Sequence, residues 1–366
     1  MSKTAIRGAR ALLTATAAML ATSCATTMTD TASMTGDMRE GPGGEAGPIA
    51  LRDQGFFWVG TRTQEVENGT AINGQMYVGY QLVAEPKHPY PLLLVHGGGG
   101  QATDWMGTPD GRDGFLDYFL AAGFDVYFVD RPGHGRSPNS PFYGELGPAP
   151  TTQFISNLFT AQSEQYPGTG LPDDPMVIQH TASSEPGPTV SNAILQEDLA
   201  EAIDRIGPVI MVTHSAGGPS GWLALEARPE QVQGILAIET FANMTTELAP
   251  LMTFDPPLAE GEAVALEERP SEGENRNPCM LQPEGSVRTL PAFEGKPIMS
   301  IVSPNSFPLF TPNVHCSVHS LEQLGADAQL IRLEEIGIEG NGHFMNEELN
   351  IGELSAVFID WLETVE

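Results

Sequence analysis

One serine lies in a sequence setting that suits a nucleophile. Residues 209–212 form an apolar run predicted to be a buried strand, and it leads directly into residues 213–218, which read T-H-S-A-G-G. Small residues around a serine allow a sharp turn from strand into helix that exposes the hydroxyl without clashes. Gly217 and Gly218 meet this requirement, whereas Thr213 is bulkier than the turn prefers. The pattern favours Ser215 as a nucleophile; the alternative is a serine that caps a buried helix.

A glycine-rich loop follows a second predicted strand. The apolar run 91–95 ends in His96, and residues 97–100 are four glycines. Glycines at this point let the backbone turn tightly and aim N–H groups at a negative charge that develops on a substrate oxygen. A phosphate-binding loop is less well supported, because no Lys-Ser or Lys-Thr pair follows and the spacing is not G-x-G-x-x-G with an acidic partner.

The elements that must position these residues alternate along the chain. Short runs that are apolar on both faces predict the central strands of a parallel sheet covered by helices. These runs are residues 91–95, 126–129, 209–212, 235–238, 297–302 and 329–333, and residues 57–59 and 76–83 predict antiparallel N-terminal strands. Helical periodicity covers 194–206, between Ser191 as cap and Gly207 as stop, and again 354–362. This alternation predicts an α/β fold with right-handed crossovers.

Two stretches interrupt the alternation within a predicted domain of residues 51–366. Residues 138–190 and 241–292 are long, rich in Pro and Gly, and only weakly periodic. Loops of this length inside a compact domain are usually lids or caps over a functional site. We expect both to be cap or lid insertions, the alternative being surface elaboration without a role.

Several motifs resemble those of the α/β-hydrolase superfamily. Residues 213–218 resemble its G-x-S-x-G nucleophile elbow, and residues 130–137 (D-R-P-G-H-G-R-S) resemble its structural D-x-x-G-x-G-x-S turn. From about residue 91 to the end, the chain resembles a small bacterial carboxylesterase family, through residues 105–112, 214–215, 238–239 and 342–343. The resemblance implies a mostly parallel sheet flanked by helices, with Gly98 and Ala216 as the oxyanion-hole donors. One departure is that Gly98 and Gly99 stand where the characterised esterase of that family has adjacent cysteines.

The resemblance also implies the partners of Ser215. The general base follows the nucleophile along the chain, and His343 lies in a turn-rich loop after the last predicted strand. In the esterase family the triad acid is a Glu after the sixth strand, which is Glu239 here. The usual position after the seventh strand offers no carboxylate in residues 303–307. Rival acids and bases are expected to point elsewhere: Glu334, Glu335, Glu339, His134, His315 and His319.

Composition excludes some partners. There are 47 acidic residues against 17 Lys and Arg, and the formal charge is −30, so a phosphate-tracking surface and a nucleic-acid partner are not expected. The excess of acidic residues is better explained by solubility than by an acidic site for a cationic ligand. No metal-ligand spacing of Cys and His is present, and no cofactor is expected. The oligomeric state is open.

The N-terminus is typical of bacterial export. Basic residues precede an apolar stretch, 11–21, that is too short for a permanent membrane span, and residues 21–24 (A-T-S-C) resemble a lipobox. We therefore expect residues 1–23 to be a lipoprotein-type signal, Cys24 to be lipidated, and residues 24–50 to be a flexible tether. The alternative is ordinary cleavage nearby. With Cys24 set aside, Cys279 and Cys316 remain as one possible disulfide in an oxidising compartment.

Together these features predict an exported serine hydrolase, periplasmic or anchored in the outer membrane, that cleaves small-molecule or polymeric carboxylic esters through an acyl-enzyme. The alternatives are hydrolysis of a thioester, lactone, amide or activated C–C bond, or a non-catalytic envelope lipoprotein on the same scaffold. Dehalogenase and epoxide-hydrolase chemistry is disfavoured, because no Asp or Glu stands at the position of Ser215.

Overall fold

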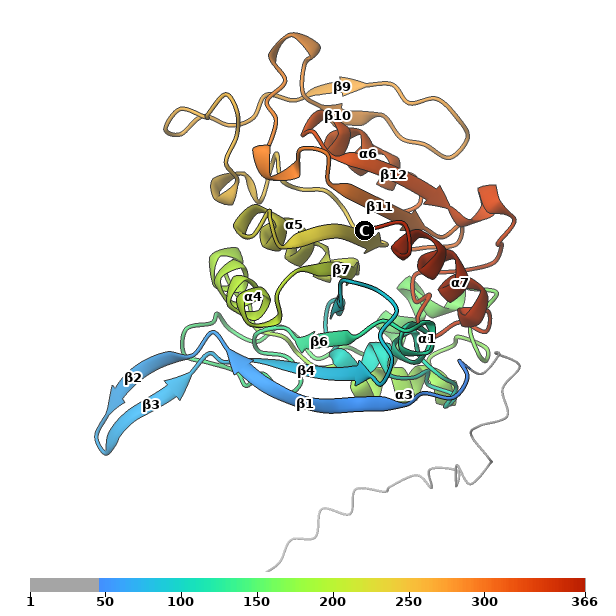
Figure 1. The fold of residues 1–366 in the computed structure, drawn as a ribbon. Helices are drawn as coiled ribbons and strands as arrows, with labels where there is room; N and C mark the ends of the chain where they lie inside the picture. The colour runs from blue at the N-terminus through green and yellow to red at the C-terminus, as the bar shows by residue number, and fades with distance from the viewer. Residues whose placement is uncertain (1–45, 366) are drawn as a thin grey trace, which may run out of the picture. The chain divides into compact units, whose positions relative to one another are not determined.

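A mostly parallel eight-stranded sheet forms the centre of the fold (Figure 1). The computed structural model describes residues 46–365. The strand order is β1-β4-β6-β5-β7-β8-β11-β12, in which β1 and β4 are antiparallel to their neighbours and the strands from β6 to β12 run parallel. The strands are β1 (Leu51–Val59), β4 (Met76–Val83), β5 (Leu92–Val95), β6 (Val126–Asp130), β7 (Val209–His214), β8 (Val232–Ile238), β11 (Pro297–Val302) and β12 (Asp327–Arg332). All eight strands that the sequence predicts are therefore present.

Helices cover both faces of this sheet, and each face carries its own core. Alternate residues of β5 show the division: Leu93 belongs to the core that also contains residues of α4 (Asn192–Ile206), α5 (Gly218–Ala227) and α6 (Val314–Gln323). Leu94 packs on the other face with α1 (Phe115–Ala122) and α7 (Ile351–Leu362). Both faces of the central strands are buried, as their continuous apolar runs predict.

The helix that precedes β7 begins and ends where its sequence predicts. The side chain of Ser191 accepts a hydrogen bond from the backbone N–H of Ile194 at 3.3 Å, which caps the first turn of α4. Gly207 ends the helix with φ of 97°, a backbone conformation that glycine adopts without steric cost. The next residues enter β7, the strand that carries the candidate nucleophile.

The two long insertions differ in structure. Residues 138–190 contain α2 (Thr152–Leu158) and α3 (Pro175–Ser183), whereas residues 241–292 are mainly loop around the two short strands β9 (Glu267–Arg269) and β10 (Cys279–Leu281). The sequence does not predict the hairpin of β2 (Arg62–Val66) and β3 (Gly69–Asn73), which extends away from the sheet (Figure 1). Its side chains are mostly exposed, so it lacks the alternating apolar pattern by which strands are found.

Candidate active site

Ser215 stands at the sharp turn between β7 and α5. Its φ is 52°, a left-handed conformation that residues other than glycine seldom adopt. The flanking glycines are required for close packing: a Cβ at Gly217 would overlap the carbonyl oxygen of His96, and one at Gly218 would overlap the side chain of Thr240. Thr213, bulkier than a glycine, is accommodated because its methyl group faces Gly221, where even a built Cβ would lie 3.4 Å away.

His343 meets Ser215 directly. Its Nε2 lies 2.9 Å from Oγ of Ser215, a distance at which the imidazole can accept the hydroxyl proton. The rings of Phe159 and Phe310 stack against the imidazole, with centroids 4.9 Å and 4.8 Å away. This burial lowers the pKa of His343, and the nearby His180 adds to the effect. The ring is therefore held neutral, the form in which it can act as a base.

Glu239 lies behind the imidazole, on the side away from Ser215. Its Oε2 is 3.3 Å from Nδ1 of His343, and the carboxyl group is fully buried. The backbone N–H of Ser303 donates to Oε1 at 2.6 Å, and the hydroxyl of Ser306 donates to Oε2. Burial raises the pKa of Glu239, while the hydrogen bonds from Ser306 and Ser303 oppose that rise. The structure thus brings together the three residues that the sequence analysis selected.

Two supporting residues escaped the sequence analysis. Ser306 lies in residues 303–307, which follow β11 and contain no carboxylate. No sequence pattern marks a serine there as the donor to a distant glutamate. Glu348 holds the turn that carries His343, because it accepts hydrogen bonds from Nδ2 of Asn341 and the backbone N–H of Gly342, each at 2.5 Å. Burial raises the pKa of Glu348 to about 7. Nothing in its spacing distinguishes it from the neighbouring Glu347.

The glycine-rich loop lies against the serine turn. A Cβ built on Gly98 would lie 3.3 Å from the Cβ of Ala216, and one on Gly97 would lie 3.2 Å from the Cβ of Ser215. This proximity follows from the sheet order, because β5 and β7 are parallel neighbours whose carboxyl ends meet at one edge. The two residues expected to donate to an oxyanion therefore face the same space beside Ser215.

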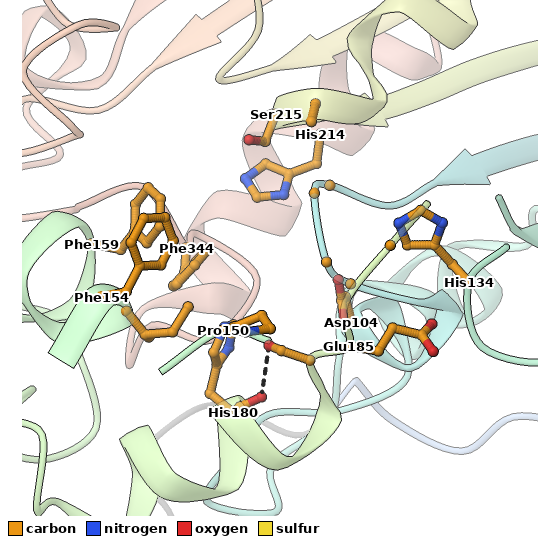
Figure 2. A pocket seen from close by; sticks show the side chains of 18 of the residues that line it. Asp104, His134, Pro150, Phe154, Phe159, His180, Glu185, His214, Ser215 and Phe344 are labelled. Atoms are coloured by element: carbon orange, nitrogen blue, oxygen red, sulfur yellow. Dashed lines mark hydrogen bonds between the residues drawn. The ribbon is translucent and has the colours of Figure 1, made fainter. Parts of the chain in front are cut away.

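A cavity of about 490 Å³ opens at Ser215 and His343. One wall is aromatic and apolar, with Phe154, Phe159 and Phe344, while Asp104 and Glu185 lie on the opposite side (Figure 2). A cavity of this size suits a small ligand or part of a larger one.

Insertion 138–190 supplies much of the cavity wall. Insertion 241–292 contributes none of the residues that line the cavity within the described part of the chain. Of the two insertions expected to be caps or lids, only residues 138–190 line the cavity, and a lid role for them stays a prediction. Length and Pro/Gly content are shared by both stretches and do not tell which one folds toward the site.

Most of the rival residues lie away from the cavity. Glu334 pairs with Arg332 at 2.8 Å, and Glu335 pairs with Arg276 at 2.8 Å. His319 pairs with Glu322 on the surface of α6, and neither His315 nor His319 lines the cavity. His134 does line it, but its Nδ1 lies 3.1 Å from the carbonyl oxygen of Pro132, within the structural turn that follows β6.

Two of the three cysteines lie among the described residues. Cys279 and Cys316 form a disulfide that joins β10 to α6, with their Cα atoms 5.2 Å apart. Together with His315 they are the one His/Cys/Asp/Glu group among residues 46–365 close enough to bind a metal, but the sulfurs are bonded to each other and offer no thiolate. Cys24, the signal 1–23 and most of the tether 24–50 lie outside the described residues.

Comparisons with known proteins bear on the family and the fold. Residues 92–354 match a model described as the alpha/beta hydrolase family. The chain is 31% identical over 338 residues to a probable secreted lipase, phiG, of Fungal sp. (strain ATCC 74256), a match that covers 84% of this chain and 89% of the relative. A solved structure described as a novel bacterial esterase superposes with a TM-score of 0.66 at 20% identity, over 87% of this chain and 98% of that chain, and shows a shared fold.

Within residues 46–365, no helix has the length and apolar character that crossing a membrane requires.

Proposed function

The chain belongs to the alpha/beta hydrolase family, and from that premise we propose that it is a serine hydrolase that cleaves carboxylic esters through an acyl-enzyme. The observation that carries the proposal is the continuous chain of contacts from Ser215 through His343 to Glu239. A nucleophile, a base and an orienting acid within hydrogen-bond reach of one another are the arrangement that acyl transfer needs.

In the proposed reaction, Oγ of Ser215 attacks the ester carbonyl carbon while Nε2 of His343 accepts the hydroxyl proton. The tetrahedral intermediate collapses, and the imidazolium returns that proton to the departing alcohol. Water then attacks the carbonyl carbon of the acyl-serine and loses a proton to Nε2 of His343. The second tetrahedral intermediate collapses, the imidazolium returns that proton to Oγ of Ser215, and the carboxylic acid is released. Glu239 holds the imidazole in the required tautomer and stabilises its positive charge through Nδ1.

We propose that the N–H groups of Gly98 and Ala216 bind the oxyanion of the intermediate. Their proximity to each other and to Ser215 supports this role. Donors fixed before the reaction begins stabilise the developing charge without reorganising, which is why such a site contributes strongly to catalysis.

Ester chemistry is favoured over other acyl bonds by the relative, whose name describes it as a probable secreted lipase. The two-sided cavity suits an ester with an apolar group against Phe154 and Phe159 and a more polar group on the opposite side. The narrower relationship to the small bacterial carboxylesterase family is part of the same proposal.

A fluorophosphonate probe tests the nucleophile. The wild-type protein should label rapidly at Ser215, as located by peptide mass spectrometry, and Ser215→Ala should neither label nor turn over substrate. A panel of p-nitrophenyl esters of increasing acyl length, set beside matched thioesters and anilides, tests the bond. Labelling at another residue, activity retained by Ser215→Ala, or a preference for anilides would contradict the proposal.

We also propose that the protein is exported and attached to a membrane through lipidated Cys24, with residues 24–50 as the tether to the hydrolase domain. The relative named as secreted supports export. The three acyl chains of a bacterial lipoprotein bind firmly, whereas one chain binds marginally. In cell fractionation, Cys24→Ala should move the protein from the membrane to the soluble fraction; unchanged membrane association would contradict the anchor.

A further inference from the structure

Arg131 contacts both halves of the proposed oxyanion hole. It is the first residue after β6, and its side chain lines the cavity. Nη2 donates to the carbonyl oxygen of Gly97 at 2.5 Å, and Nη1 donates to the carbonyl oxygen of Ala216 at 3.3 Å. One guanidinium group therefore bridges the glycine-rich loop and the serine turn. The family resemblance implies only a structural role for the turn that contains it.

The contact with Gly97 acts on the Gly98 N–H through the peptide bond. The carbonyl of Gly97 and the N–H of Gly98 belong to one planar trans peptide, so they point in opposite directions. A donor that fixes the carbonyl oxygen therefore fixes the direction of the N–H. A cationic donor also draws electron density toward the oxygen and makes the N–H a stronger donor.

His96 contributes a second donor to the same carbonyl. The backbone N–H of Arg131 donates to Nε2 of His96 at 2.9 Å, so Nε2 is the unprotonated nitrogen. The proton of the neutral ring must then be on Nδ1, which lies 2.9 Å from the carbonyl oxygen of Gly97 and donates to it. Burial, with the charge of Arg131, lowers the pKa of His96 well below its usual value and keeps this ring neutral. The backbone and the side chain of Arg131 thus both act on the Gly97 carbonyl, one through His96 and one directly.

The guanidinium keeps its charge in this position. Burial lowers the pKa of Arg131 to about 10, which leaves it protonated at neutral pH, and the carboxylate of Asp104 acts in the opposite direction. The loop is also fixed by insertion 138–190, where the N–H of Glu185 donates to the carbonyl oxygen of Gly99 at 2.9 Å. Arg131 is the group that joins the loop to Ala216.

We infer that Arg131 is a positioning residue for the reaction: it sets the separation of the Gly98 and Ala216 N–H groups and aims the Gly98 N–H at the oxyanion. The inference rests on the proposed function. Because an oxyanion exists only in the transition state and the intermediate, Arg131 should act on kcat far more than on KM.

The test compares Arg131→Ala, Arg131→Lys and a matched control, Arg136→Ala. Arg136 lies in the same turn and bonds Asp130 at 2.6 Å. With a p-nitrophenyl ester, Arg131→Ala should lower kcat by about 10- to 100-fold, less than the 10²- to 10³-fold of losing a donor outright, with KM within about two-fold. Arg131→Lys should retain a higher kcat than Arg131→Ala, and Arg136→Ala should change kcat by less than about three-fold.

Two further measurements separate positioning from general damage to the fold. Millimolar guanidinium should restore part of kcat to Arg131→Ala and none to Arg136→Ala. A trifluoromethyl ketone, which forms a tetrahedral oxyanion on the serine, should bind Arg131→Ala more weakly in proportion to the loss of kcat. A raised KM with unchanged kcat would mean that Arg131 binds substrate, and an equal loss in Arg136→Ala would mean a structural role; either result overturns the inference. Failure of the proposed function is distinct, because Ser215→Ala would then remain active.

Discussion

Ser215 and Glu239 are the residues that directly follow two neighbouring parallel strands, and both have a left-handed backbone, with φ of 52° and 51°. The strands β7 and β8 pair in register up to His214 and Ile238, so the two turns begin at the same level of the sheet. Backbone strain in residues other than glycine persists only where the surrounding structure enforces it, and it concentrates at functional sites. The proposed nucleophile and the proposed acid thus both lie at left-handed turns, which end two adjacent strands.

The strain at Ser215 predicts an unusual order of stability. Glycine normally destabilises a protein relative to alanine by about 0.5–1 kcal/mol, but a left-handed backbone costs a residue with a Cβ about 1–2 kcal/mol. Ser215→Gly should therefore be at least as stable as Ser215→Ala in urea unfolding. At Ser220, inside α5, the ordinary order with alanine more stable is the control. A clear advantage of alanine at both positions would show that the turn stores no strain.

Replacing Glu239 by Gln should remove the charge that supports the imidazolium while keeping the shape. By analogy with other triad acids, kcat should fall on the order of 10⁴-fold with little change in KM. The exposed Glu339, a rival in the sequence, provides the matched control, and Glu339→Gln should retain wild-type kcat. The assignment is wrong if Glu339→Gln is the inactive variant.

The pH profile of Glu239→Gln should move in a defined direction. Burial lowers the pKa of His343. A carboxylate 3.3 Å from Nδ1, as Glu239 provides when ionised, favours the protonated ring and acts against this lowering. Without the carboxylate, the imidazole stays neutral to lower pH, and the neutral ring is the active base. The acid limb of kcat/KM should therefore lie at lower pH in Glu239→Gln than in wild type. An acid limb that moves upward would contradict this arrangement.

Ser306 should matter to the reaction although it never touches substrate. Its hydroxyl donates to Oε2 of Glu239, the oxygen that faces His343. A hydrogen bond to a charged group contributes about 1.5–3 kcal/mol, so Ser306→Ala should lower kcat by roughly ten-fold or more. Ser306→Thr, which keeps a hydroxyl, should retain more activity than Ser306→Ala. Equal kcat in Ser306→Ala and wild type would show that the Ser303 N–H alone holds the carboxylate.

The sequence predicts the sheet and the turn that carries Ser215 for a physical reason, whereas His343 and Glu239 follow from the family resemblance. Strands buried on both faces must be apolar throughout, and the sharp turns after them need small residues, so β5, β7 and β8 are visible without a structure. The sequence does not reveal contacts made between distant loops. The bond from Ser306 to Glu239 spans 67 residues, and the bridge from Arg131 to Ala216 spans 85. Neither contact leaves a periodic signal in the sequence. No such signal shows which of the two insertions lines the cavity either.

The Cys279–Cys316 disulfide should stabilise the fold without serving catalysis. The two cysteines are 37 residues apart in sequence, and the chain-entropy model gives about 3–4 kcal/mol for closing a loop of that length. Neither cysteine lines the cavity, and the bond joins the second insertion to α6 instead of to the lid. In urea unfolding, the double variant Cys279→Ser/Cys316→Ser should therefore have a free energy of unfolding lower by about that amount. Its kcat and KM should stay near the wild-type values. Thiol titration of the unfolded, unreduced wild type is the control and should find neither cysteine free. If kcat fell along with stability in conditions where the variant is fully folded, the second insertion would be coupled to the active site after all.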